Sequence, residues 1–101
     1  MNANMAKCLV VSKVLVADGI MTDDERAFLA EMMRRLGLTP DEQQRVVELE
    51  GLDEADHIVA ALSADERREI VELLVDAASA DGKLSPHELA AVKRVTAALG
   101  V

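Results

Sequence analysis

A nine-residue segment that carries chemically useful side chains occurs twice in the sequence. Residues 17–25 read Ala-Asp-Gly-Ile-Met-Thr-Asp-Asp-Glu, and residues 80–88 read Ala-Asp-Gly-Lys-Leu-Ser-Pro-His-Glu. The second copy begins 63 residues after the first, and the similarity continues to residues 38 and 101. This repetition predicts that the same helix–turn–helix unit occurs twice, with a spacer between the two copies.

Each copy supplies two carboxylates that could bind a divalent cation. They are Asp18 and Glu25 in the first copy and Asp81 and Glu88 in the second. If the two units pack with twofold pseudo-symmetry, all four carboxylates could converge. Their mutual repulsion would then favour a hard cation, and Ca²⁺ or Mg²⁺ would suit oxygen ligands of this kind.

The spacing of the motif is that of the second half of an EF-hand loop, in which a glycine makes the turn and a glutamate ends the loop. The first and third ligand positions of such a loop would fall on Val14 and Val16, and in the second copy on Ala77 and Ser79. Because these positions lack the required oxygens, a standard calcium loop is excluded and only a nonstandard site stays open.

Helix capping is the competing interpretation of the same residues. Thr22 and Glu25 have the spacing of a capping box, and the second copy repeats this spacing. Capping does not explain Asp18 and Asp81, since a carboxylate is unfavourable at the C-terminal end of a helix dipole. These two aspartates therefore either accept hydrogen bonds from turn amides or bind a cation.

The elements that must position these residues are all helices. We expect helices over about residues 4–17, 23–36, 39–50, 53–62, 63–80 and 86–99, with further capping boxes at Thr39 and Ser63. The first helix is apolar nearly all round, which is expected at the centre of a bundle. The other inward-facing positions are expected to be Phe28, Leu29, Met32, Met33, Leu36, Val46, Val47, Leu49, Ile58, Val59, Leu62, Ile70, Leu73, Leu74, Ala77, Ala78, Leu89, Val92, Val95 and Leu99. The predicted fold is a compact all-α bundle of about six helices, forming one domain over residues 1–101 with two pseudo-symmetric helix–turn–helix units.

The composition limits the classes of partner. Half of the 101 residues are hydrophobic and Phe28 is the one aromatic residue, a composition that suits closely packed helices. Eleven basic and 19 acidic residues give a net charge of −8, so nucleic acid is not expected as a partner, whereas cations or a basic protein surface are. No apolar run is long enough for membrane insertion. Cys8 is the one cysteine, which fits a reducing compartment and therefore the cytoplasm. We expect a monomer or weak dimer.

The sequence shows no set of residues typical of a catalytic site. His57 and His87 are 30 residues apart and belong to no Cys/His cluster, and Cys8 lies on an apolar helix. We therefore expect no enzyme activity and no certain cofactor. The alternative is a small enzyme that uses the paired carboxylates for metal-dependent hydrolysis, which would require a concave pocket around them.

The doubled Ala-Asp-Gly-x-x-Thr/Ser-x-x-Glu units, each leading to a Leu-Gly helix end at residues 36–37 and 99–100, resemble the tellurite-resistance TerB-like domain. That domain also occurs at the N-terminus of some membrane-anchored DnaJ-type co-chaperones. The resemblance implies an all-helical bundle with internal pseudo-symmetry and a role in bacterial stress or metal resistance. It also implies that Asp18, Glu25, Asp81 and Glu88 are metal contacts. The second copy departs from the acidic pattern at Lys83, Pro86 and His87, so it would be the weaker cation site.

These observations together predict a non-catalytic, acidic interaction module. We expect it to bind a protein partner and to respond to a divalent cation.

Overall fold

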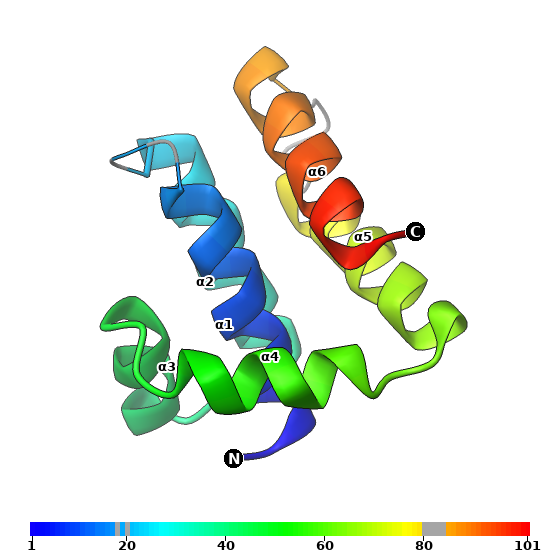
Figure 1. Cartoon of the computed structure of the whole chain (residues 1–101). Helices are drawn as coiled ribbons and strands as arrows, with labels where there is room; N and C mark the ends of the chain where they lie inside the picture. Colours follow the sequence, from blue (N-terminus) through cyan, green and yellow to red (C-terminus); the bar gives the residue numbers. More distant parts are fainter. Residues whose placement is uncertain (18, 20, 80–84) are drawn as a thin grey trace.

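Six helices make up the part of the chain that the computed structural model describes, which is residues 1–17, 19, 21–79 and 85–101. They are α1 (Ala3–Val16), α2 (Asp23–Arg35), α3 (Pro40–Val47), α4 (Leu52–Ala60), α5 (Ala64–Ala78) and α6 (Pro86–Leu99) (Figure 1). No strand occurs in these residues, and the radius of gyration is 12.2 Å, close to the ~13 Å of a compact 100-residue domain. The predicted all-α bundle is confirmed.

Local sequence fixes the starts of four of these helices. Capping boxes form at Thr22, Thr39, Ser63 and Ser85, as the sequence predicts. In each box the hydroxyl accepts a hydrogen bond from the amide three residues on, and the glutamate at that position accepts one from the amide of the cap residue. The boxes thereby satisfy amides that the first helical turn leaves without a partner.

The third helix ends earlier than the sequence predicts. The expected end was about residue 50, but α3 stops at Val47 because Leu49 adopts a left-handed conformation with φ of 57°. Gly51 then takes φ of 82° immediately before α4, a conformation that suits glycine because it has no Cβ. The chain therefore turns sharply between α3 and α4.

The helix packing follows the pseudo-symmetry that the repeat predicts. The pair α1–α2 corresponds to the pair α5–α6, and the helices within each pair are in contact. Across the pairs α2 packs against α5, and α6 packs against α1 in the corresponding way. Helix α2 also contacts its own counterpart α6, while the spacer helices α3 and α4 cover α1, with α4 crossing the lower part of the molecule in Figure 1.

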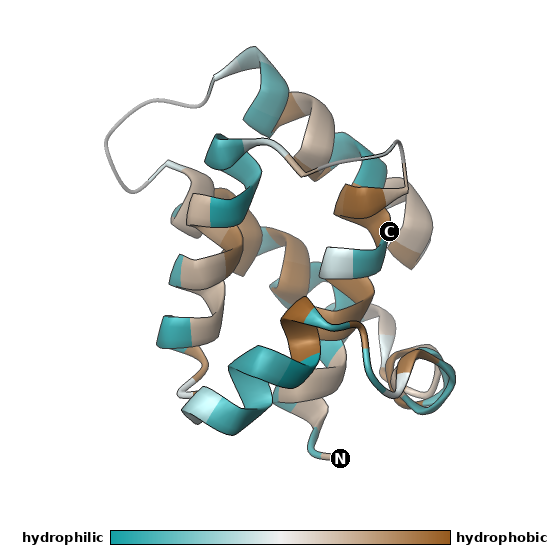
Figure 2. Ribbon diagram, turned by 90° about the vertical axis from the view of Figure 1, so that its left-hand side faces the viewer, coloured by the Kyte–Doolittle hydropathy of each residue, from teal (hydrophilic) through white to brown (hydrophobic). Residues whose placement is uncertain are grey.

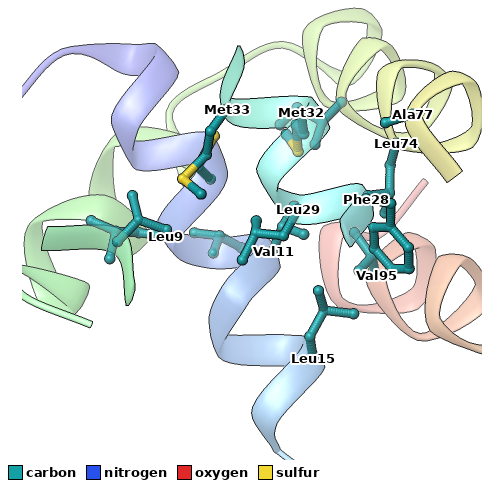
Figure 3. Packing of buried hydrophobic residues seen from close by; sticks show 14 of the residues in the cluster. Leu9, Val11, Leu15, Phe28, Leu29, Met32, Met33, Leu74, Ala77 and Val95 are labelled. Atoms are coloured by element: carbon teal, nitrogen blue, oxygen red, sulfur yellow. The ribbon is translucent and has the colours of Figure 1, made fainter. Parts of the chain in front are cut away.

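The core forms where the two pairs meet (Figure 3). Phe28 of α2 points towards Leu74 of α5 and Val95 of α6, and all three side chains are almost fully buried. Helix α1 contributes eight buried residues, which confirms its predicted central position. Each of the longer helices carries apolar and hydrophilic residues along its length (Figure 2). Among the described residues, no helix combines the length and the apolar character that crossing a bilayer requires.

Two residues predicted to face the core are exposed instead. Leu89 is 44% exposed, because the inward stripe of α6 runs through Glu88, Ala91, Val95 and Leu99 and leaves Leu89 beside it. Val47 is 64% exposed, because its neighbour Val46 fills the core position at the end of α3. Both expectations relied on apolar character alone, which does not fix the rotation of a helix.

Candidate functional site at the starts of α2 and α6

The first turns of α2 and α6 lie close to each other in the bundle. The Ser85 hydroxyl is 3.5 Å from a carboxylate oxygen of Asp24, which links the cap residue of α6 to the first turn of α2. Two of the predicted cation ligands, Asp18 and Asp81, lie outside the described residues, as does Gly82, the glycine of the second Asp-Gly turn. The structure therefore brings the helix starts of the two motif copies together, and the position of the aspartates stays a prediction.

Glu25 uses both of its carboxylate oxygens within the protein. Oε1 accepts a hydrogen bond from the Thr22 amide at 2.9 Å, which completes the capping box. Oε2 accepts one from the Arg94 guanidinium of α6, also at 2.9 Å. The Glu25 side chain is 6% exposed and that of Arg94 is 32% exposed, so this ion pair is largely shielded from water.

Arg94 also contacts the C-terminal end of α1. Its Nη1 donates a hydrogen bond to the Val14 carbonyl at 3.3 Å. A cation suits this position, because the C-terminal end of a helix carries partial negative charge. The guanidinium therefore joins α1, α2 and α6, and the sequence analysis did not identify it. The available signal was that the repeat pairs this arginine with Glu31, a reversal of charge.

Glu88 is the counterpart of Glu25 but has a different environment. Its Oε1 completes the capping box by accepting a hydrogen bond from the Ser85 amide at 2.9 Å. Its Oε2 accepts no hydrogen bond from the described residues, although the residue is only 9% exposed. The side chain lines a pocket of about 250 Å³ between α2, α5 and α6, together with Asp24, Phe28, Glu31 and Ala77.

Glu31 also lines this pocket and is already paired. Its carboxylate accepts hydrogen bonds from Arg34 and Arg35, one turn further along α2. These hydrogen bonds lower the pKa of Glu31 from 4.5 to about 2, so the group stays ionised at any physiological pH. The charge of Glu31 is therefore balanced by arginines of its own helix and not by a group in the pocket.

Comparison of the chain with models of known protein families gives a match over nearly its whole length. A family model described as tellurite resistance protein TerB matches residues 4–101. The chain belongs to the TerB family. No curated protein and no solved structure matches the chain.

In this TerB-family protein, the predicted divalent site is not assembled by the described residues alone. No group of three or more His, Cys, Asp or Glu side chains in residues 1–17, 19, 21–79 and 85–101 is placed to hold a metal ion. A divalent cation at Glu25 would have to compete with the Arg94 guanidinium. The predicted Ca²⁺ or Mg²⁺ site at Asp18, Glu25, Asp81 and Glu88 therefore depends on the two aspartates.

The other chemically reactive side chains have ordinary structural surroundings. Cys8 is fully buried, and burial raises the pKa of its thiol from 9.0 to about 12, which keeps the thiol protonated. His57 and His87 are both exposed. Because it stays protonated, the Cys8 thiol is poorly suited to act as a nucleophile.

A second concave surface lies beside the first motif turn. It is a groove of about 540 Å³ lined by Val16, Met21, Arg26, Leu29, Met33 and Val47. These residues come from the end of α1, the turn that follows it, α2 and the end of α3. The exposed side chain of Val47 at the end of α3 thus lines this apolar groove. The sequence analysis did not predict the groove.

Proposed function

We propose that this TerB-family protein is a non-catalytic interaction module of a bacterial stress or metal-resistance system. It acts in the cytoplasm by binding a protein partner, and a divalent cation at the acidic turns modulates that binding. Membership of the TerB family supports the tellurite-resistance context. The observation that carries the proposal is the apolar groove beside the first acidic turn.

The groove has the properties of a docking site for a short apolar segment. Its volume of about 540 Å³ lies within the ~300–1,000 Å³ of typical binding pockets. Met21 and Met33 give it adaptable walls, because the flexible methionine side chain can fit differently shaped partners. Val47, which is 64% exposed, would lose contact with water when the groove is filled.

The occupant that fits best is an amphipathic, basic segment of a partner protein. Its apolar face would fill the groove, and Arg26 in the lining could donate to one of its carbonyl groups. Its basic residues would be attracted by the net charge of −8, which accelerates association with positively charged partners. The cation can modulate such binding because it would reduce the negative charge near the groove.

The roles of the motif glutamates support a non-catalytic function. Glu25 is engaged in a capping box and an ion pair, and neither contact leaves it free for proton transfer. Burial of the Cys8 thiol with its raised pKa also argues against nucleophilic chemistry. Magnesium-dependent hydrolysis of a model phosphate ester that disappears in Glu88→Gln would instead support the enzyme alternative.

Selection of peptides from a random library, with the immobilised protein as bait, tests the proposed interaction. Enriched peptides should combine apolar residues at helical spacing with Lys or Arg, and should shift the NMR signals of Met21, Leu29 and Val47. Val47→Asp should weaken their binding at least about tenfold, because it places a charge against the apolar face of the peptide. Leu89→Asp is the matched control, since Leu89 is also exposed but lies outside the groove. Equal binding to Val47→Asp and the unaltered protein would refute the proposal.

A further inference from the structure

Equivalent glutamates in the two halves of the bundle have different contacts. The repeat relates Glu25 to Glu88, and it relates Val14 to Ala77. In the first half, the Arg94 guanidinium bridges Glu25 Oε2 and the Val14 carbonyl, at 2.9 and 3.3 Å. In the second half, Glu88 and Ala77 both line the pocket between α2, α5 and α6. The pocket therefore occupies the place that corresponds to the guanidinium site.

The chain does not supply the second guanidinium from the equivalent position. The residue that corresponds to Arg94 is Glu31, which is an acceptor and already pairs with Arg34 and Arg35. The residues that correspond to those two arginines are Ala97 and Ala98, so the second copy has no such local pairs. An arginine of the same chain therefore occupies the site in the first half, whereas the chain has no arginine at the equivalent position of the second half.

Glu88 supplies the pocket with a hydrogen-bond acceptor. More than nine-tenths of this residue is buried, yet its Oε2 accepts no hydrogen bond from the described part of the chain. Because Glu88 lines the pocket, this oxygen can accept a charge-assisted hydrogen bond from a cationic group that enters it. Asp24, on the same pocket, adds a second negative charge.

We propose that this pocket binds the guanidinium group of an arginine side chain from the partner protein. The proposal rests on the interaction function above and names one anchor of its basic partner. The guanidinium would donate to Glu88 Oε2 and to the Ala77 carbonyl near the C-terminal end of α5, where the helix dipole favours a cation. It would also pack against the Phe28 ring that lines the pocket.

The size and chemistry of the pocket favour an arginine side chain over other occupants. A volume of about 250 Å³ lies below the ~300 Å³ of small-molecule pockets and is sufficient for one side chain. A carboxylate and a main-chain carbonyl on one pocket suit the several donors of a planar guanidinium better than the compact ammonium of lysine. A divalent ion is disfavoured, since the described residues form no metal-binding group.

NMR titration of the ¹⁵N-labelled protein with N-acetyl-arginine N-methylamide tests the proposal directly. At constant ionic strength, the amide signals of Ala77, Ser85 and Glu88 should shift with millimolar affinity. The neutral citrulline analogue, which has nearly the same shape, should produce no such shifts. Equal shifts with citrulline, or equal affinity for the lysine analogue, would overturn the assignment of a guanidinium site.

Two variants separate the pocket from the general acidity of the surface. Glu88→Gln keeps the capping box, because glutamine also completes it, but removes the charge-assisted hydrogen bond and should weaken arginine binding at least about tenfold. Glu66→Gln changes an equivalent capping glutamate that lies on the exposed start of α5, and binding should be unchanged. Equal affinity of Glu88→Gln and the unaltered protein would overturn the proposal.

A third variant restores the missing residue. Glu31→Arg combined with Arg34→Ala and Arg35→Ala copies the second repeat into the first. It should fill the pocket from within, raise the melting temperature and abolish binding of the arginine probe. Unchanged probe binding by this folded variant would contradict the proposal. Val47→Asp should leave probe binding intact, so the pocket and the groove of the proposed function can fail independently.

Discussion

Because Glu25 forms an ion pair with Arg94, we predict that the two motif glutamates contribute differently to the stability of the fold. Judged from sequence alone, glutamine at position 25 should hardly change stability, because it also completes a capping box. The structure changes this expectation, since Glu25→Gln also removes the charge from the acceptor of the hydrogen bond that Arg94 donates to residue 25. Glu88→Gln retains its capping box and loses no such partner among the described residues.

The size of the difference follows from the kind of hydrogen bond. A hydrogen bond to a charged group contributes ~1.5–3 kcal/mol, and partial exposure of Arg94 places the expected loss for Glu25→Gln at the lower end, ~1–2 kcal/mol. For a domain of this size, each kcal/mol lowers the melting temperature by ~4–8 °C. Glu88→Gln should change the free energy of unfolding by less than ~0.5 kcal/mol, because glutamine keeps the capping box.

Urea unfolding followed by far-ultraviolet circular dichroism measures both variants under identical conditions. Adding Arg94→Met to each background completes a double-mutant cycle, which isolates the pairwise energy. The cycle with Glu25→Gln should give a coupling of ~1 kcal/mol or more, and the cycle with Glu88→Gln should give a coupling near zero. Equal losses for the two glutamine variants, or no coupling between Glu25 and Arg94, would refute the reasoning.

Three further predictions address the cation, the buried thiol and the first motif turn. Millimolar Ca²⁺ or Mg²⁺ should raise the melting temperature beyond the effect of NaCl at equal ionic strength, and Asp18→Asn should abolish the rise; no divalent-specific shift would exclude the cation site. The pKa of Cys8 is raised by burial to about 12, so its contribution to stability is complete below about pH 9 and is lost as the pH rises towards about 12. Urea unfolding at pH 8 and pH 10.5 should therefore show a steeper loss for the unaltered protein than for Cys8→Ala, and parallel losses would contradict this. Gly19→Val should destabilise by ~1–2 kcal/mol, because Gly19 has φ of 124°, and thermal unfolding unchanged by the substitution would show that the turn tolerates a side chain.

The sequence by itself determined the features that depend on neighbouring residues. Thr22 and Glu25 are three residues apart, so their capping box follows from the chain before any packing, and the other three boxes follow in the same way. Gly19 likewise has positive φ at the first turn, as expected for a glycine that follows the end of a helix. The repeat also predicted that the two helical pairs pack symmetrically, because similar units present similar apolar faces to one another.

Only the tertiary structure decided which charges meet across the bundle. Glu25 and Arg94 are 69 residues apart, so no local spacing could pair them, and the contact exists because α2 packs against α6. The same packing places Glu31 and Glu88 around one pocket. The repeat alone shows only that Glu31 corresponds to Arg94. The rotation of each helix was also decided by packing, which explains why Leu89 and Val47 face outward despite their apolar side chains. Hydrogen-bonded caps are set by the backbone within one turn, whereas ion pairs and pockets require that distant helices dock in one orientation.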